Sequence, residues 1–79
     1  MKKFTVVYLA NEGDIETFGP FPTFNAAFGW AKADAEHLQQ IADNNGVYKD
    51  LISTDDRTLT LVDLGTWVIT ELQPIMKRN

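Results

Sequence analysis

Residues 23–43 constrain the fold more than any other stretch, because their pattern predicts one long amphipathic helix. The apolar residues recur with helical period and fall within about 100° of one another on a helical wheel, the width of a core-facing stripe. This stripe consists of Phe24, Ala27, Phe28, Ala31, Ala35, Leu38 and Ala42. Thr23 can cap the start of the helix, and Gly46 can take the left-handed conformation that ends one. Four of the seven stripe residues are alanine, so we expect the helix to lie close against a flat sheet.

The segment before this helix predicts a β-hairpin. Residues 3–10 alternate in character and are rich in the β-branched and aromatic side chains that suit strands. A turn cluster follows, and residues 15–18 can fold back as the antiparallel partner. Residues 19–22, Gly-Pro-Phe-Pro, should end that strand because proline lacks the N–H that a sheet ladder needs.

The segment after the helix predicts a second hairpin, from residues 58–62 and 66–72, closed by Pro74. Residues 47–53 fit neither a strand nor a helix cleanly, and we interpret them as a crossing segment or a short edge strand. The predicted order is β-β-α-β-β, an α+β fold in which one helix packs on one face of an antiparallel sheet. At 79 residues, the chain (1–79) should form a single domain.

The predicted outer face of the sheet raises a question of cover. The first and last strands carry apolar residues on both sides, whereas one helix covers only one face. Three covers remain open: the loop formed by residues 43–57, a second copy of the chain, or a partner protein.

Charge is distributed unevenly along the chain. The sequence carries 11 acidic and 7 basic residues, and residues 4–76 hold all of the acidic residues but only three of the basic ones. Such a body should bind nucleic acid poorly, since that affinity comes mainly from cations that displace counterions. A basic protein surface is the better partner, although acidity that serves only solubility is the alternative. The absence of cysteine, of a cleavable leader pattern and of an apolar run of about 20 residues favours the cytoplasm.

No catalytic or metal-binding pattern stands out. His37 is the single histidine, and its pairing with Asp34 offers two metal ligands where a catalytic zinc site needs three. Ser53 is the single serine and lacks the glycines of a nucleophile elbow. Residues 43–50 lack the glycine position and the late glutamate of an EF-hand loop. We therefore expect no enzyme activity, no cofactor and no metal.

Two features are candidates for partner binding. Trp30, His37 and Ile41 form an apolar shoulder beside the core stripe, and tryptophan often dominates binding energy. The alternative is that Trp30 covers the edge of the core. The second feature is acidic side chains on the two hairpins, spaced so that they can roughly imitate a phosphate backbone. The candidate partner-binding residues are Glu12, Asp14, Glu16, Asp55, Asp56 and Trp30.

Part of the chain also resembles known proteins. The run Phe18-Gly19-Pro20-Phe21, followed by Thr23, Ala27, Trp30 and Ala31, is similar to small phage and bacterial proteins in which a Gly-Pro-Phe turn leads into an alanine-rich helix. In length, acidity and α+β pattern the chain resembles the anti-CRISPR inhibitors of phages and mobile elements. That resemblance is one of type, so no residue role is carried over. It implies binding to a CRISPR effector complex, often at a basic surface that would otherwise take DNA.

The leading hypothesis is therefore a non-enzymatic inhibitor that blocks a basic nucleic-acid-binding surface, in the cytoplasm of an infected or host bacterium. The alternative is a structural or assembly module, monomeric or a homodimer, that binds through an apolar sheet face or through Trp30.

Overall fold

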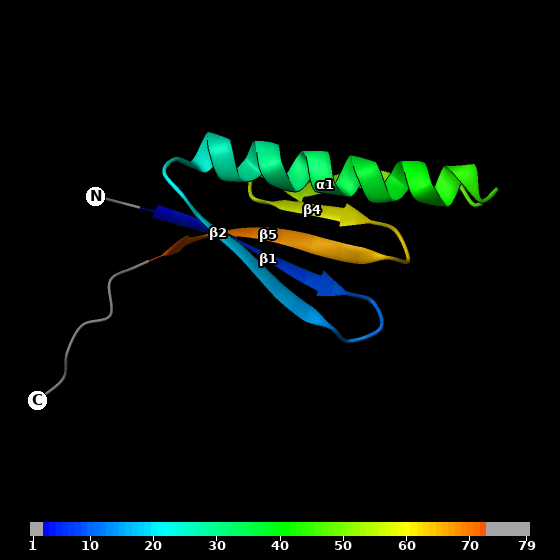
Figure 1. Cartoon of the computed structure of the whole chain (residues 1–79), viewed down its shortest axis with the longest axis horizontal. Coiled ribbons are helices and arrows are strands. Elements are labelled where there is room, and N and C mark those ends of the chain that lie inside the picture. Colours follow the sequence, from blue (N-terminus) through cyan, green and yellow to red (C-terminus); the bar gives the residue numbers. More distant parts are fainter. Residues whose placement is uncertain (1–2, 73–79) are drawn as a thin grey trace, which may run out of the picture.

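The computed structural model describes residues 3–72 of the chain. These residues form an α+β fold in which one helix packs across an open antiparallel sheet (Figure 1). The elements in chain order are β1 (Lys3–Ala10), β2 (Ile15–Phe21), α1 (Phe24–Asn44), β3 (Leu51–Asp55), β4 (Thr58–Leu61) and β5 (Gly65–Leu72). The predicted fold class is confirmed, with β3 as one strand more than the predicted order. Pro74, and three of the basic residues that flank the acidic body, Lys2, Lys77 and Arg78, lie outside the described residues.

The helix begins and ends where its sequence predicts. The Thr23 hydroxyl oxygen accepts a hydrogen bond of 3.0 Å from the backbone N–H of Ala26, which satisfies one of the free donors of the first turn. At the other end Gly46 has a φ of +81°, a left-handed conformation that glycine adopts at little cost.

The sheet order is β2-β1-β5-β4-β3, so the first and last strands of the chain are paired. Val6 lies opposite Ile69 and Tyr8 lies opposite Trp67 in this antiparallel pair. The three strands with neighbours on both sides, β1, β5 and β4, supply all of the buried strand residues among those described: Val6, Leu59, Leu61, Trp67 and Ile69.

One sequence prediction about a strand limit is corrected, and one open alternative is decided. Strand β2 does not stop before Gly19 but continues through Pro20 to Phe21. It can do so because β2 is an edge strand, where a missing N–H leaves no neighbour unpaired, and a register shift between Phe4 and Val6 absorbs the irregularity. The ambiguous segment after the helix contributes β3, the opposite edge strand.

The core lies between α1 and the sheet. Its buried members are Val6, Ala27, Ala31, Ala35, Leu59, Leu61, Trp67 and Ile69. The three buried alanines of the predicted stripe allow the helix to approach closely enough that Trp67 is fully covered. Partly buried aromatic residues complete the core at its margin, and Phe4 meets Phe24 edge to face with ring centroids 6.0 Å apart.

The second face of the sheet has no covering loop among residues 3–72. The segment before β3 lies on the helix side, since the side-chain amide of Gln39 donates a 2.9 Å hydrogen bond to the carbonyl of Lys49. The side chains that alternate onto the second face within the strands are Thr5, Val7, Leu9, Ile15, Thr17, Ile52, Thr58, Thr60, Thr66, Val68 and Thr70. In the middle of the sheet this face is uncharged and partly exposed, and the charged strand residues that the register places on it, Lys3 and Asp55, lie at strand ends.

Candidate functional site

Acidic side chains gather at the end of the molecule where the β1–β2 and β4–β5 turns meet. The backbone N–H of Asn11 donates to the carbonyl oxygen of Leu64 at 2.8 Å, and the backbone N–H of Val62 donates to the backbone carbonyl oxygen of Asp50 at 2.9 Å. These bonds connect the two turns to each other and to the segment before β3. The C-terminal half of α1 lies over the same end (Figure 1). We call Glu12, Asp14, Glu16, Asp34, Asp43, Asp50 and Asp63 the acidic end.

One lysine partly offsets this charge within the described chain. The ammonium nitrogen of Lys49 lies 3.0 Å from a carboxylate oxygen of Asp63, and the Asp63 side chain remains 67% exposed. Exposed ion pairs of this kind contribute little to stability, roughly 0–1 kcal/mol. Lys49 pairs with Asp63 and does not neutralise the other carboxylates of the acidic end. Seven carboxylates against one lysine give this end a strong negative potential.

The structure does not bring the two predicted acidic groups together. Asp55 is the last residue of β3 and Asp56 lies in the β3–β4 turn, at the opposite end of the strands from Glu12 and Asp14. The backbone N–H of Arg57 donates to the Asp55 carboxylate at 2.9 Å, and this bond is the main reason that the pKa of Asp55 is lowered. Asp56 lies 4.0 Å from the exposed Arg57 side chain. One flat partner surface would therefore contact either the acidic residues of the first hairpin or Asp55 and Asp56, and not both groups.

Tyr8 lies at the centre of the acidic end, on the helix side of β1. Its ring packs against Trp67 with centroids 4.6 Å apart, and its hydroxyl lies 3.5 Å from the carbonyl oxygen of Leu64, a long hydrogen bond. Gly65 makes this position possible, because a Cβ atom there would come within 2.6 Å of the Tyr8 hydroxyl oxygen. Gly65, the first residue of β5, thus provides space for an aromatic ring.

Asp34 is a site residue that the sequence reasoning placed on a solvated helix flank. The indole N–H of the buried Trp67 donates to a carboxylate oxygen of Asp34 at 3.0 Å. A buried indole N–H usually needs such an acceptor, and leaving it unpaired costs about 1–3 kcal/mol. The signal that could have identified Asp34 is its position directly before Ala35 of the core stripe, where its side chain borders the sheet.

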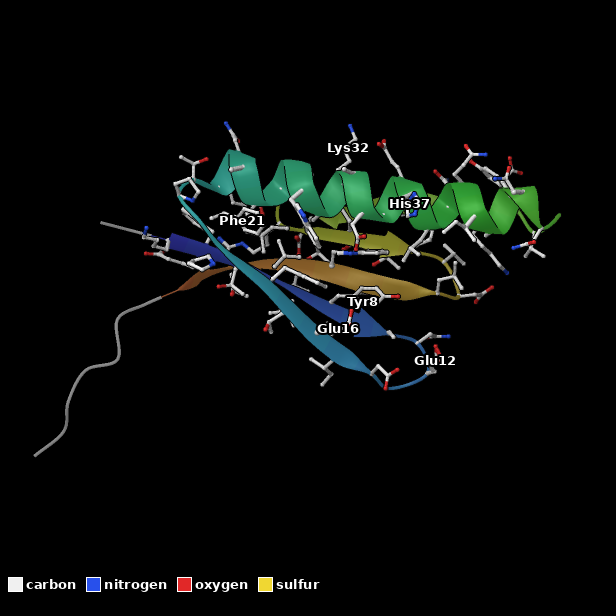
Figure 2. The ribbon with its side chains drawn as sticks, viewed as in Figure 1. Tyr8, Glu12, Glu16, Phe21, Lys32 and His37 are labelled. Carbon is white, nitrogen blue, oxygen red and sulfur yellow. The ribbon has the colours of Figure 1, made fainter. Side chains whose placement is uncertain are left out.

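Four carboxylates act on the Tyr8 hydroxyl. Burial raises the pKa of Tyr8 most, and the negative charges of Asp34, Glu12, Glu16 and Asp14 raise it further, in that order. The hairpin carboxylates and the helix carboxylate are therefore close enough to one another to act on one group. Figure 2 places Tyr8, Glu16 and Glu12 along the first hairpin and His37 on the helix above them.

A groove opens beside Tyr8, between α1 and the first hairpin. It has a volume of about 340 Å³ and is lined by Tyr8, Glu12, Leu38, Ile41, Ala42 and Leu64. The first hairpin diverges from the helix along its length: Phe21 lies near the start of α1 (Figure 2), whereas the hairpin turn lies away from the helix C-terminus (Figure 1). Ile41, the third member of the predicted apolar shoulder, remains 44% exposed there.

Trp30 belongs to the opposite, closed part of this interface. Its ring lies 4.4 Å from that of Phe18 and 6.0 Å from that of Phe21, measured between centroids, and the residue is half-buried. This position favours the interpretation that Trp30 covers the edge of the core. Its role in partner binding stays a prediction.

The part of the chain that the structure describes contains no candidate metal site. No three His, Asp or Glu side chains come together there as ligands, and His37 is exposed on the helix. In residues 3–72 no helix has the length and apolar character needed to cross a membrane. No protein family model matches the chain, and neither a curated protein nor a solved structure is significantly similar to it.

Proposed function

We propose that this protein is a non-enzymatic binding protein whose acidic end occupies a basic, nucleic-acid-binding surface of a larger assembly. The supporting observation is that seven acidic residues, from two turns, one strand, one helix and the segment before β3, lie toward the same end of the molecule, with Lys49 as the described lysine among them. The remaining described carboxylates, four in number, are accompanied by three basic residues, so the charge is concentrated at one end. Long-range attraction would orient that end toward a positive partner.

The finer form of the proposal is that the partner is a CRISPR effector complex and that the protein acts as an inhibitor, a phage-encoded mimic of DNA, in the cytoplasm of the infected bacterium. This form rests on the resemblance in size, acidity and α+β pattern. Carboxylates at Glu12, Asp14 and Glu16 lie on turn and strand, at intervals of several Å, which suits a surface that normally contacts successive phosphates.

Direct binding to a panel of guide-loaded CRISPR effector complexes tests this proposal. We expect the protein to bind complexes that lack target DNA and to be excluded from complexes that already hold it, because both would occupy the same basic surface. Binding should weaken steeply between about 50 and 200 mM salt, since the contact is electrostatic. Failure to bind any complex in the panel would overturn the CRISPR form of the proposal.

Two charge-reversal variants of equal size separate the acidic end from general acidity. Glu12→Lys with Asp14→Lys should abolish binding, whereas Asp55→Lys with Asp56→Lys, at the opposite end, should weaken it only slightly. Binding that is insensitive to salt, or equal loss in both double variants, would contradict a role specific to the acidic end.

A second candidate function is assembly through the second face of the sheet. The observation that favours it is the threonine-rich and aliphatic surface around Val7 and Val68, which α1 does not cover. If this face pairs with a second copy, sedimentation should show a dimer that persists at high salt, and Val68→Lys should convert it to a monomer. A monomer at all concentrations would exclude this function.

A further inference from the structure

The groove between α1 and the first hairpin has an apolar wall that the fold leaves uncovered. Leu38, Ile41 and Ala42 come from successive turns of the helix, and Leu64 comes from the β4–β5 turn. A volume of about 340 Å³ is at the small end of the range for ligand pockets, roughly 300–1,000 Å³. Such a groove can take one long side chain more readily than a helix or a strand.

The mouth of the groove is aromatic and negatively charged. Glu12 is part of its lining, and Tyr8 forms one wall. The Tyr8 ring packs against Trp67 and fits there because Gly65 has no side chain. Asp34 lies behind this wall, where its carboxylate accepts the indole N–H of Trp67 at 3.0 Å, and the negative charges of Asp34, Glu16 and Asp14 also act on the Tyr8 hydroxyl. The described cation at this end, Lys49, is engaged by Asp63 in the neighbouring turn. An occupant with an aliphatic stem and a positive head is complementary to the apolar wall and to the negatively charged mouth.

We propose that this groove binds a single arginine side chain projected from the basic surface of the partner. The inference rests on the proposed function and identifies the group that the acidic end recognises.

Arginine fits the groove better than lysine for three reasons. Its methylene stem can lie along Leu38 and Ile41 while its head stays at the polar mouth. Its planar guanidinium can stack on the Tyr8 ring, and its fork of N–H groups can donate two parallel hydrogen bonds to a carboxylate such as Glu12. The lysine ammonium is a strongly hydrated point charge that gains less from an aromatic wall.

Titration of the isotopically labelled protein with hexa-arginine, and separately with hexa-lysine, tests this inference by NMR. We expect hexa-arginine to shift the indole N–H of Trp67 and the amides of Leu38, Ile41 and Ala42, and to bind at least about fivefold more tightly than hexa-lysine. Equal affinity for both peptides, or shifts confined to other regions, would overturn the inference.

Two pairs of variants locate the contact. Ile41→Lys places a positive charge at the groove, and Ile52→Lys places the same charge on the opposite face at a site of nearly equal exposure, 46% against 44%. Ala42→Phe fills the groove, and Ala33→Phe adds the same ring to the exposed side of the same helix. We expect Ile41→Lys and Ala42→Phe to weaken hexa-arginine binding about tenfold, and each control to change it less than about twofold.

The outcomes distinguish this inference from the proposed function. If Ile41→Lys and Ala42→Phe bind hexa-arginine as their controls do, while Glu12→Lys with Asp14→Lys still abolishes partner binding, the groove inference fails and the proposed function stands. If neither peptide binds at low salt, both fail. Thermal melting of each variant checks that it is folded, and Ile41→Lys, at an exposed position, keeps the test decisive if Ala42→Phe does not fold.

Discussion

The flank of α1 that faces the first hairpin has two halves, one packed against aromatic side chains and one partly exposed. Trp30 and Ile41 lie on the same predicted apolar shoulder, yet Trp30 is packed against Phe18 at 4.4 Å whereas Ile41 is 44% exposed. The difference comes from the sheet, because β2 lies near the start of α1 and diverges from it toward the hairpin turn (Figure 1). The closed half therefore supplies stability, and the open half supplies a surface for contact.

The charges follow the same division. The closed half is lined by aromatic rings from Phe18, Phe21 and Trp30. The open half collects the carboxylates that surround Tyr8. A region that gains little from packing can carry unpaired negative charge at low cost because its side chains stay hydrated, which is what a partner-binding surface requires. The following predictions test this division, beginning with the largest effect.

Trp30→Ala should lower the free energy of unfolding by about 2–3 kcal/mol, less than for a fully buried tryptophan because the ring is half-buried. Urea denaturation followed by circular dichroism measures this change. A loss below about 0.5 kcal/mol would show that the closed half does not supply stability.

Asp34→Ala should lower the free energy of unfolding by about 1–2 kcal/mol, because the buried indole N–H of Trp67 loses its 3.0 Å acceptor. The same denaturation measurement applies, and the indole N–H resonance of Trp67 should move. The matched control is Glu36→Ala, an exposed acidic residue on the same helix, which should change stability by less than about 0.5 kcal/mol.

Ile41→Ala should change the free energy of unfolding by only about 0.5 kcal/mol, since the open half contributes little packing. Comparison with Trp30→Ala under identical conditions sharpens the contrast between the two halves. A loss as large as that of Trp30→Ala would mean that the groove is closed in solution.

The Tyr8 phenol should ionise above the ordinary tyrosine pKa of about 10, and ultraviolet titration can follow this change. Because the pKa of Tyr8 is raised in the folded state, its contribution to stability is present below the ordinary pKa of about 10 and is lost as the pH rises through the raised value. Glu12→Gln with Glu16→Gln should lower the pKa of Tyr8 only in part, since burial is the larger cause. No change in this double variant would show that the hairpin carboxylates do not act on the Tyr8 hydroxyl.

Local patterns in the sequence were enough to predict the helix and most of the strands. The apolar period of residues 24–42 identified the buried face, and Thr23 and Gly46 marked the ends, because capping depends on neighbouring residues alone. The end of β2 was predicted too early, since the tolerance for Pro20 depends on β2 being an edge strand, a property of the whole sheet. The edge strand β3 was one of two interpretations that the sequence left open, and only the sheet order decided between them.

The candidate site was predictable only in part. The sequence alone determined that the body of the chain is acidic and that Trp30, His37 and Ile41 share one helix flank. Only the tertiary structure decided that Glu12 and Asp34 lie around the same tyrosine, that Asp55 lies at the other end, and that the shoulder is half covered. The physical reason is that helical and strand periods act over a few residues, whereas strand order and twist bring together groups that are distant in the chain.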